Sequence, residues 1–131
     1  MGEHTNVGYD TFPIQGKALG REVDVIQKLS DGTEARLVGT VVRDDLEDPL
    51  VTMITLGDGD VVLGTESAGY TPVEQGSYKG KRVSVCFNYD TSMQIEGTIR
   101  RNDMEEPQLT VIALDTGRFV LSTECMYQPP K

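Results

Sequence analysis

The side chains that could carry chemistry occur in pairs along this sequence. Arg43 and Arg101 stand 58 residues apart, and so do Glu66 and Glu124. An arginine can hold a carboxylate through two parallel hydrogen bonds, so this set suits either a ligand site present twice or one internal network used twice. We favour the internal network, because a glutamate at the start of a helical turn also complements the positive end of that turn.

An acidic turn follows each arginine. Its carboxylates are Asp44, Asp45, Glu47 and Asp48 in the first turn, and Asp103, Glu105 and Glu106 in the second. Clustered carboxylates could bind a hard divalent cation through oxygen. However, the order Asp-x-Asp-x-Asp-Gly is missing, and a proline follows each turn directly. We therefore expect no metal site and interpret both turns as solvated.

The sequence offers no pair of residues suited to nucleophilic catalysis. A nucleophilic thiol needs a base beside it, and the only histidine, His4, stands far along the chain from Cys86 and Cys125. Serine and threonine lack a base for the same reason, and no glycine-rich loop precedes a helix. We expect a protein that is not an enzyme and holds no cofactor. The cysteines are expected to be free thiols, with a disulfide between them as the alternative.

An internal repeat contains these paired residues. Residues 39–66 match residues 97–124 at a constant separation of 58. Upstream, residues 20–25 match residues 80–85 at a separation of 60, so the second copy is two residues shorter in its first loop. The match covers most of both halves with one change of length, which indicates two copies of one fold.

Within each copy the apolar residues alternate with polar ones. Val23 and Val25 alternate with Glu22 and Asp24, and turn signals such as Gly57-Asp58-Gly59 separate the runs. This pattern predicts an all-β fold with an arm, two copies and a linker. These parts are the arm 1–19, the acidic first copy 20–72, the linker 73–79 and the second copy 80–131. The expected strands are 21–28, 34–44, 49–57, 60–64, 69–71, 81–88, 93–102, 107–114, 118–122 and 126–128.

Five short strands in about fifty residues can hide their edges only by closing on themselves. A long second strand, a hairpin and one helical turn before the last strand describe an SH3-like barrel in each copy. Gly39 and Gly97 lie in the middle of strands, where a curled strand tolerates glycine. A barrel of this size is marginally stable alone. We therefore expect the barrels to pack on each other or on the arm, through Phe12, Pro13 and Ile14.

The order of elements resembles the SH3-like small barrels, among them the Sm-like and Tudor domains. In the first Sm signature a glycine precedes an apolar residue by two positions and an aspartate by six, as Gly39, Val41 and Asp45 do here. The second copy repeats this pattern. Asp48-Pro49 replaces the residues expected next, and Thr65-Glu66 replaces the Arg-Gly of the second signature. The resemblance therefore implies the fold without the RNA-binding residues of that family.

The resemblance to Tudor domains would imply an aromatic cage for a methylated lysine or arginine. The first copy offers only Tyr70, whereas the second offers Phe87, Tyr89, Phe119 and Tyr127. A small barrel needs its aromatic rings inside, so we expect Phe87 and Phe119 to be core residues. Tyr89 and Tyr127 then remain as aromatic candidates for binding.

Composition excludes several classes of protein. The 131-residue chain carries 21 acidic and 12 basic residues, for a formal net charge of −9. No apolar run approaches the ~18–20 residues of a membrane span, and the N-terminus lacks the pattern of a signal peptide. We expect an intracellular, cytoplasmic protein. Its size and acidity are also similar to those of accessory proteins of phages and mobile elements, which would place it in a virion instead.

The charge is distributed unevenly between the copies. The first has eleven acidic and four basic residues, for a net charge of −7, and the second has seven and six, for −1. Binding to a phosphate backbone relies on Lys and Arg. The first copy is therefore excluded as a nucleic-acid binder, while weak binding stays open for the second through residues such as Arg100. The acidity of the first copy suits a basic partner or simply keeps the protein dispersed.

These observations predict a non-enzymatic protein-interaction module whose partner is a protein, with a basic surface as one option. A structural or decoration subunit of a larger assembly such as a virion is one alternative, and an acidic inhibitor that mimics nucleic-acid charge is another. The oligomeric state stays open. The candidate interaction residues are Asp44, Asp45, Glu47, Asp48, Asp58, Asp60, Tyr89, Tyr127 and Arg100. The expected internal network consists of Arg43, Glu66, Arg101 and Glu124.

Overall fold

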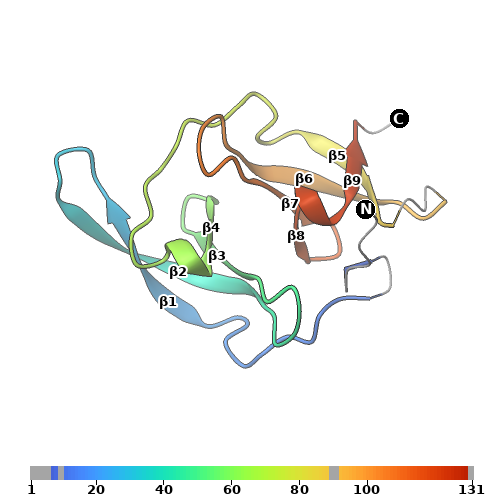
Figure 1. Ribbon diagram of the computed structural model, residues 1–131, viewed down its shortest axis with the longest axis horizontal. Coiled ribbons are helices and arrows are strands. Elements are labelled where there is room, and N and C mark those ends of the chain that lie inside the picture. Colours follow the sequence, from blue (N-terminus) through green and yellow to red (C-terminus); the bar gives the residue numbers. More distant parts are fainter. Residues whose placement is uncertain (1–6, 9–10, 89–91, 130–131) are drawn as a thin grey trace.

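The computed structural model describes residues 7–8, 11–88 and 92–129. The fold is all-β, as expected, and its two sheets lie side by side, one from each copy of the repeat (Figure 1). The first sheet is ordered β1-β2-β3-β4, with β1 (Glu22–Lys28), β2 (Glu34–Asp44), β3 (Thr52–Leu56) and β4 (Val61–Leu63). The second is ordered β8-β7-β6-β5-β9, with β5 (Arg82–Cys86), β6 (Ile95–Asn102), β7 (Thr110–Leu114), β8 (Phe119–Leu121) and β9 (Met126–Gln128).

Local sequence explains how each sheet turns back on itself. The turn between β3 and β4 contains Gly59 at a φ of 93°, and the turn between β7 and β8 contains Gly117 at 99°. Glycine adopts this left-handed conformation without steric cost. One turn of 3₁₀ helix then follows each hairpin, as η1 (Gly64–Glu66) and η2 (Ser122–Glu124).

The last strand differs between the two copies. In the second copy, β9 follows η2 closely and pairs with β5, so the second sheet gains a fifth strand and curls into a half-barrel. In the first copy, the prediction of a strand at 69–71 is wrong. Of these three residues, Tyr70 alone pairs with β1, through one bridge to Gln27. Beyond Tyr70 the chain continues to Gln75, which forms a bridge to Asp103 of the second copy.

Three apolar clusters hold the sheets together. One fills each copy, and the third joins Met53 and Val61 of the first copy to Val111 of the second, with Phe119 packed against them. The two copies therefore pack on each other through this third cluster. Figure 1 shows β4 and β8 facing each other in the middle of the molecule, where this third cluster lies.

The N-terminal segment also connects the copies. Val7 is fully buried in the core of the second copy, and Phe12 packs against the same core. Pro13 is buried, whereas Ile14 is 63% exposed and takes no part in the core. In the described part of the chain, no helix is long and apolar enough to cross a membrane.

Candidate functional site

The most ordered polar site lies between the two copies and is built around Arg43. Its guanidinium donates to both oxygens of Glu124 at 2.7 and 2.8 Å, and to both oxygens of Asp45 at 3.1 and 3.0 Å. A further bond runs from Nη1 to the carbonyl oxygen of Phe119 at 3.1 Å. The Arg43 side chain is fully buried, and the ring of Phe12 lies 4.8 Å from its guanidinium carbon.

The second copy repeats this arrangement around Arg101. Nη1 and Nη2 donate to Glu66 at 2.7 and 3.0 Å, and Nε donates to Asp103 at 2.9 Å. Nη1 also donates to the carbonyl oxygen of Val61 at 3.0 Å. Val61 and Phe119 are matching residues of the repeat, so the bonds to the glutamate and to the carbonyl oxygen are equivalent, whereas Arg43 makes two bonds to its aspartate and Arg101 makes one.

The partners, however, are exchanged between the copies. We expected one network inside each copy, but Arg43 of the first copy binds Glu124 of the second, and Arg101 of the second binds Glu66 of the first. Only the aspartates, Asp45 and Asp103, belong to the same copy as the arginine they bind. The two networks therefore fasten the copies to each other.

Each glutamate also serves its own copy. Glu66 accepts the main-chain N–H of Leu63 at 2.9 Å, and Glu124 accepts that of Leu121 at the same distance. Such a bond satisfies a donor at the start of the 3₁₀ turn. Burial would lower the pKa of Arg43, but the carboxylates of Glu124 and Asp45 outweigh it and raise that pKa. The charges are therefore held as ion pairs.

A β-bulge positions each arginine. The register between β2 and β3 shifts between Val41 and Arg43, and the register between β6 and β7 shifts at the matching place, between Ile99 and Arg101. A bulge re-aims the side chain that follows it. Arg100, the bulged residue of the second copy, is exposed.

Sequence reasoning missed a fourth member of each cluster. Gln15 donates from Nε2 to Asp45 at 2.8 Å and accepts the main-chain N–H of Asp44 at 2.7 Å. Gln75 bonds to Asp103 and to the N–H of Asn102 in the same way, at 2.7 and 2.8 Å. The signal was present, because Gln-Gly at positions 15–16 and 75–76 keeps the separation of 60. The repeat thus extends into segments that we assigned to the arm and the linker.

The acidic turn of the first copy is less exposed than expected. Asp45 is 7% exposed and lies in the buried network, so its assignment to an interaction surface is corrected. Asp44 is half-buried and accepts the N–H of Ala18, while Glu47 accepts that of Ile14. Within one turn, therefore, carboxylates that the sequence groups together point to different environments.

Some of the other candidate surface residues lie together, because the N–H of Asp60 donates to Asp58 at 3.0 Å, and Asp60 lines one small pocket with Arg100. Asp48 and Asp58 are exposed, and Asp60 binds Lys79 at 2.6 Å. Tyr127 lies on β9 and is 42% exposed, whereas Tyr89 falls outside the described residues. Among the aromatics expected in the core, Phe87 is 3% exposed and Phe119 is half-buried, and Tyr70 also proves buried.

The two cysteines are free thiols in this structure. Burial, followed by the charges of Glu124 and Cys86, raises the pKa of Cys125 to about 12. A thiol with so high a pKa is a poor nucleophile near neutral pH. Among the residues that the structure describes, no three His, Cys, Asp or Glu side chains are grouped as ligands of a metal ion.

Two hollows share one matching side, at equivalent positions of the two copies. One, of about 550 Å³, has Val23 and Val41 of the first copy in its lining. The other, of about 500 Å³, has the matching residues Val83 and Ile99, together with Tyr78, Tyr127 and Pro129. Ala18 lines the first hollow where Tyr78 lines the second. The two hollows therefore differ in the side chain that lines them at this repeat position.

The chemistry of the molecule separates into these two kinds of site. In the described part of the chain every buried side-chain nitrogen and oxygen has a hydrogen-bond partner, so the Arg–Glu clusters are closed structural sites. The hollows, by contrast, are mostly apolar, with Asp24 in the lining of the first and Lys81 and Arg82 in that of the second. No protein-family model matches this chain, and no curated protein or solved structure matches it either.

Proposed function

We propose that the chain is a non-enzymatic protein-interaction module in which each copy of the repeat forms an SH3-like barrel. The long second strand, the hairpin and the 3₁₀ turn before the last strand support this description in the second copy. In the first copy, the bridge between Tyr70 and Gln27 takes the place of the fifth strand.

The observation that carries the proposal is the pair of matching apolar hollows. Concave, mostly apolar sites with a few polar groups at the rim are typical of binding surfaces. The buried polar groups are committed to holding the copies together, whereas the hollow linings differ between the copies. Different linings on one scaffold suit two different peptide segments, since specificity depends on the side chains of the pocket.

The test is selection of peptides from a random library displayed on phage, with the full chain as the target. We expect enriched sequences whose addition shifts NMR amide signals around one hollow. Tyr78→Ala should weaken peptides that occupy the second hollow and leave the others unchanged. Failure to enrich any peptide would contradict the proposal.

The same experiment separates the two alternatives. A subunit of a larger assembly would show defined oligomers by light scattering and no selected peptide. A mimic of nucleic-acid charge would bind basic proteins without sequence preference, and this binding would collapse as salt rises.

A further inference from the structure

The outer edge of β1 in the first copy is only partly covered. The N–H of Ile26 donates to Ser67, and its carbonyl oxygen accepts from Tyr70, both at 2.8 Å. Main-chain groups in an antiparallel strand alternate between the two sides, so those of Glu22 and Asp24 face the same outer side. Within the described part of the chain, no hydrogen bond to them on that side is found.

The second copy shows what can occupy this edge. There β9 pairs antiparallel with β5, with Gln128 opposite Ser84 and Tyr127 opposite Val85. Ser84 is the repeat equivalent of Asp24. The strand edge is thus open at Asp24 in the first copy, whereas β9 covers the equivalent edge at Ser84 in the second copy.

The first hollow adjoins this open edge. Val23 and Asp24 line it from β1, Gly64 and Ser67 line it from the η1 side, and Ile54 lines it from β3. Among the described residues of this lining, Asp24 alone is charged, and its side chain is 61% exposed. A strand added beside β1 would therefore turn every second side chain toward an apolar space.

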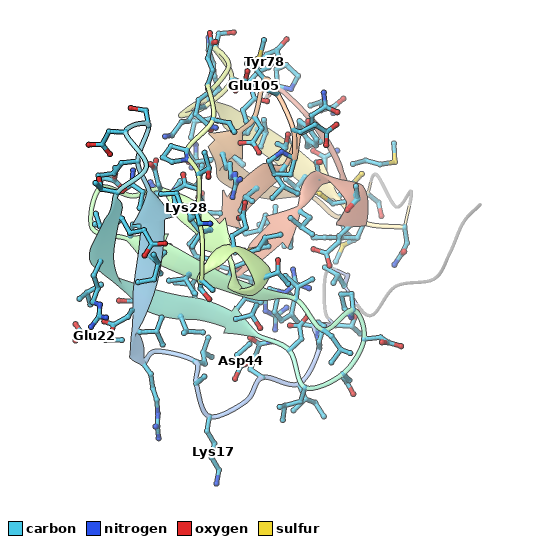
Figure 2. The ribbon with its side chains drawn as sticks, turned by 60° about the vertical axis from the view of Figure 1, so that its left-hand side comes forward. Lys17, Glu22, Lys28, Asp44, Tyr78 and Glu105 are labelled. Carbon is cyan, nitrogen blue, oxygen red and sulfur yellow. The ribbon has the colours of Figure 1, made fainter. Side chains whose placement is uncertain are left out.

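The outer face of the same edge carries acidic side chains. Glu22 and Asp24 both point to solvent, where the second copy has Arg82 and Ser84. Arg36 approaches Asp24 only at 3.8 Å with both side chains largely exposed, which is a weak pair. Opposite charges directly across two strands stabilise their pairing. Figure 2 shows Glu22 at the side of the molecule, well apart from Tyr78 of the second copy.

We propose that β1 of the first copy binds an extended segment of a partner protein, which adds to the sheet as an antiparallel strand. The segment carries apolar residues toward the hollow, alternating with Lys or Arg that face Glu22 and Asp24. The main chain supplies affinity and the alternate side chains supply specificity. This inference rests on the proposed function as a protein-interaction module and names the partner of one of its two hollows.

The test uses the full chain and a synthetic peptide, about eight residues long, in which Lys alternates with Val or Leu. We expect NMR amide shifts at Val23, Asp24 and Ser67, and slower hydrogen exchange at Asp24. Replacing Lys by Glu in the peptide should abolish binding. Higher salt should weaken the binding without removing it, since the main-chain bonds are not screened.

Two matched controls make the test specific. N-methylation of the peptide amides that face β1 should abolish binding, whereas N-methylation of the alternate amides should not. The variant Glu22→Arg with Asp24→Ser copies the residues of the second copy at exposed positions and should weaken binding about tenfold. Equal binding by both methylated peptides would overturn strand addition.

The outcomes also separate this inference from the proposed function. If the peptide binds but shifts the signals around Tyr78 and Tyr127 instead, the inference is overturned and the proposed function stands. If neither this peptide nor any library peptide binds the chain, both fail.

Discussion

The two copies of the repeat are most alike where they meet and differ most at their outer strands. At the contact, each arginine binds a glutamate of the other copy with nearly the same distances. At the outer strands, β5 is covered by β9, while β1 is covered only around Ile26 and Lys28.

The difference follows from burial. A buried ion pair that loses one partner leaves a charge in a poorly solvated place, which is costly, so both copies retain the same cluster. An exposed position carries little such penalty. Glu22 of the first copy thus stands where the second has Arg82, which binds Asp115 at 2.7 Å and Glu96 at 3.0 Å.

The largest expected effect is loss of either central arginine. Arg43→Ala and Arg101→Ala each leave one buried aspartate and one partly buried glutamate without their cation, so each should lower the free energy of unfolding by about 3–5 kcal/mol. Urea unfolding measures this loss. Arg36→Ala, at an exposed pair, is the control and should change stability by less than about 0.5 kcal/mol. A large loss for one arginine and none for the other would break the equivalence of the copies.

The exchange of partners predicts a specific pattern of coupling. In double-mutant cycles, Arg43→Ala with Glu124→Ala should show a coupling energy of about 1–3 kcal/mol, because these side chains are in contact. Arg43→Ala with Glu66→Ala should be additive within about 0.5 kcal/mol. The reverse result would place the ion pairs inside each copy.

Both mid-strand glycines should resist substitution to a similar extent. A Cβ on Gly39 would lie 2.9 Å from the carbonyl oxygen of Thr55, and one on Gly97 would lie 2.8 Å from that of Ala113. Gly39→Ala and Gly97→Ala should therefore each cost about 1–3 kcal/mol by overpacking. Thermal unfolding would measure both, and a neutral substitution at either site would contradict the close approach of the strands.

The smallest effect concerns Cys125, which stands where the first copy has Ser67. Because the folded thiol has a pKa of about 12, it holds its proton to a higher pH than the unfolded thiol. Its contribution to stability is thus fully present below the ordinary value of 9.0 and is lost as pH rises toward 12. Alkylation by iodoacetamide at pH 8 should be slow in the folded chain and fast in urea. Rapid alkylation of the folded chain would contradict this burial.

Much of the fold could be predicted from the sequence, for physical reasons that concern particular elements. Alternation of apolar residues and the glycine turns are local properties, so β2 and β3 lie close to where they were expected. The prediction of a fifth strand in the first copy was wrong, because beyond Tyr70 the chain continues to the second copy instead of pairing with β1. The division of the chain into arm, barrels and linker stays a prediction.

The sequence by itself determined that Arg43, Arg101, Glu66 and Glu124 recur as a set, since a repeat is visible without any structure. Only the tertiary structure decided which glutamate each arginine binds. Both glutamates stand at the same position in their copies, and nothing local distinguishes a partner in the same copy from one in the other. Packing of β3 and β4 against β7 and β8 brings each arginine to the opposite copy, and that packing is a property of the whole chain.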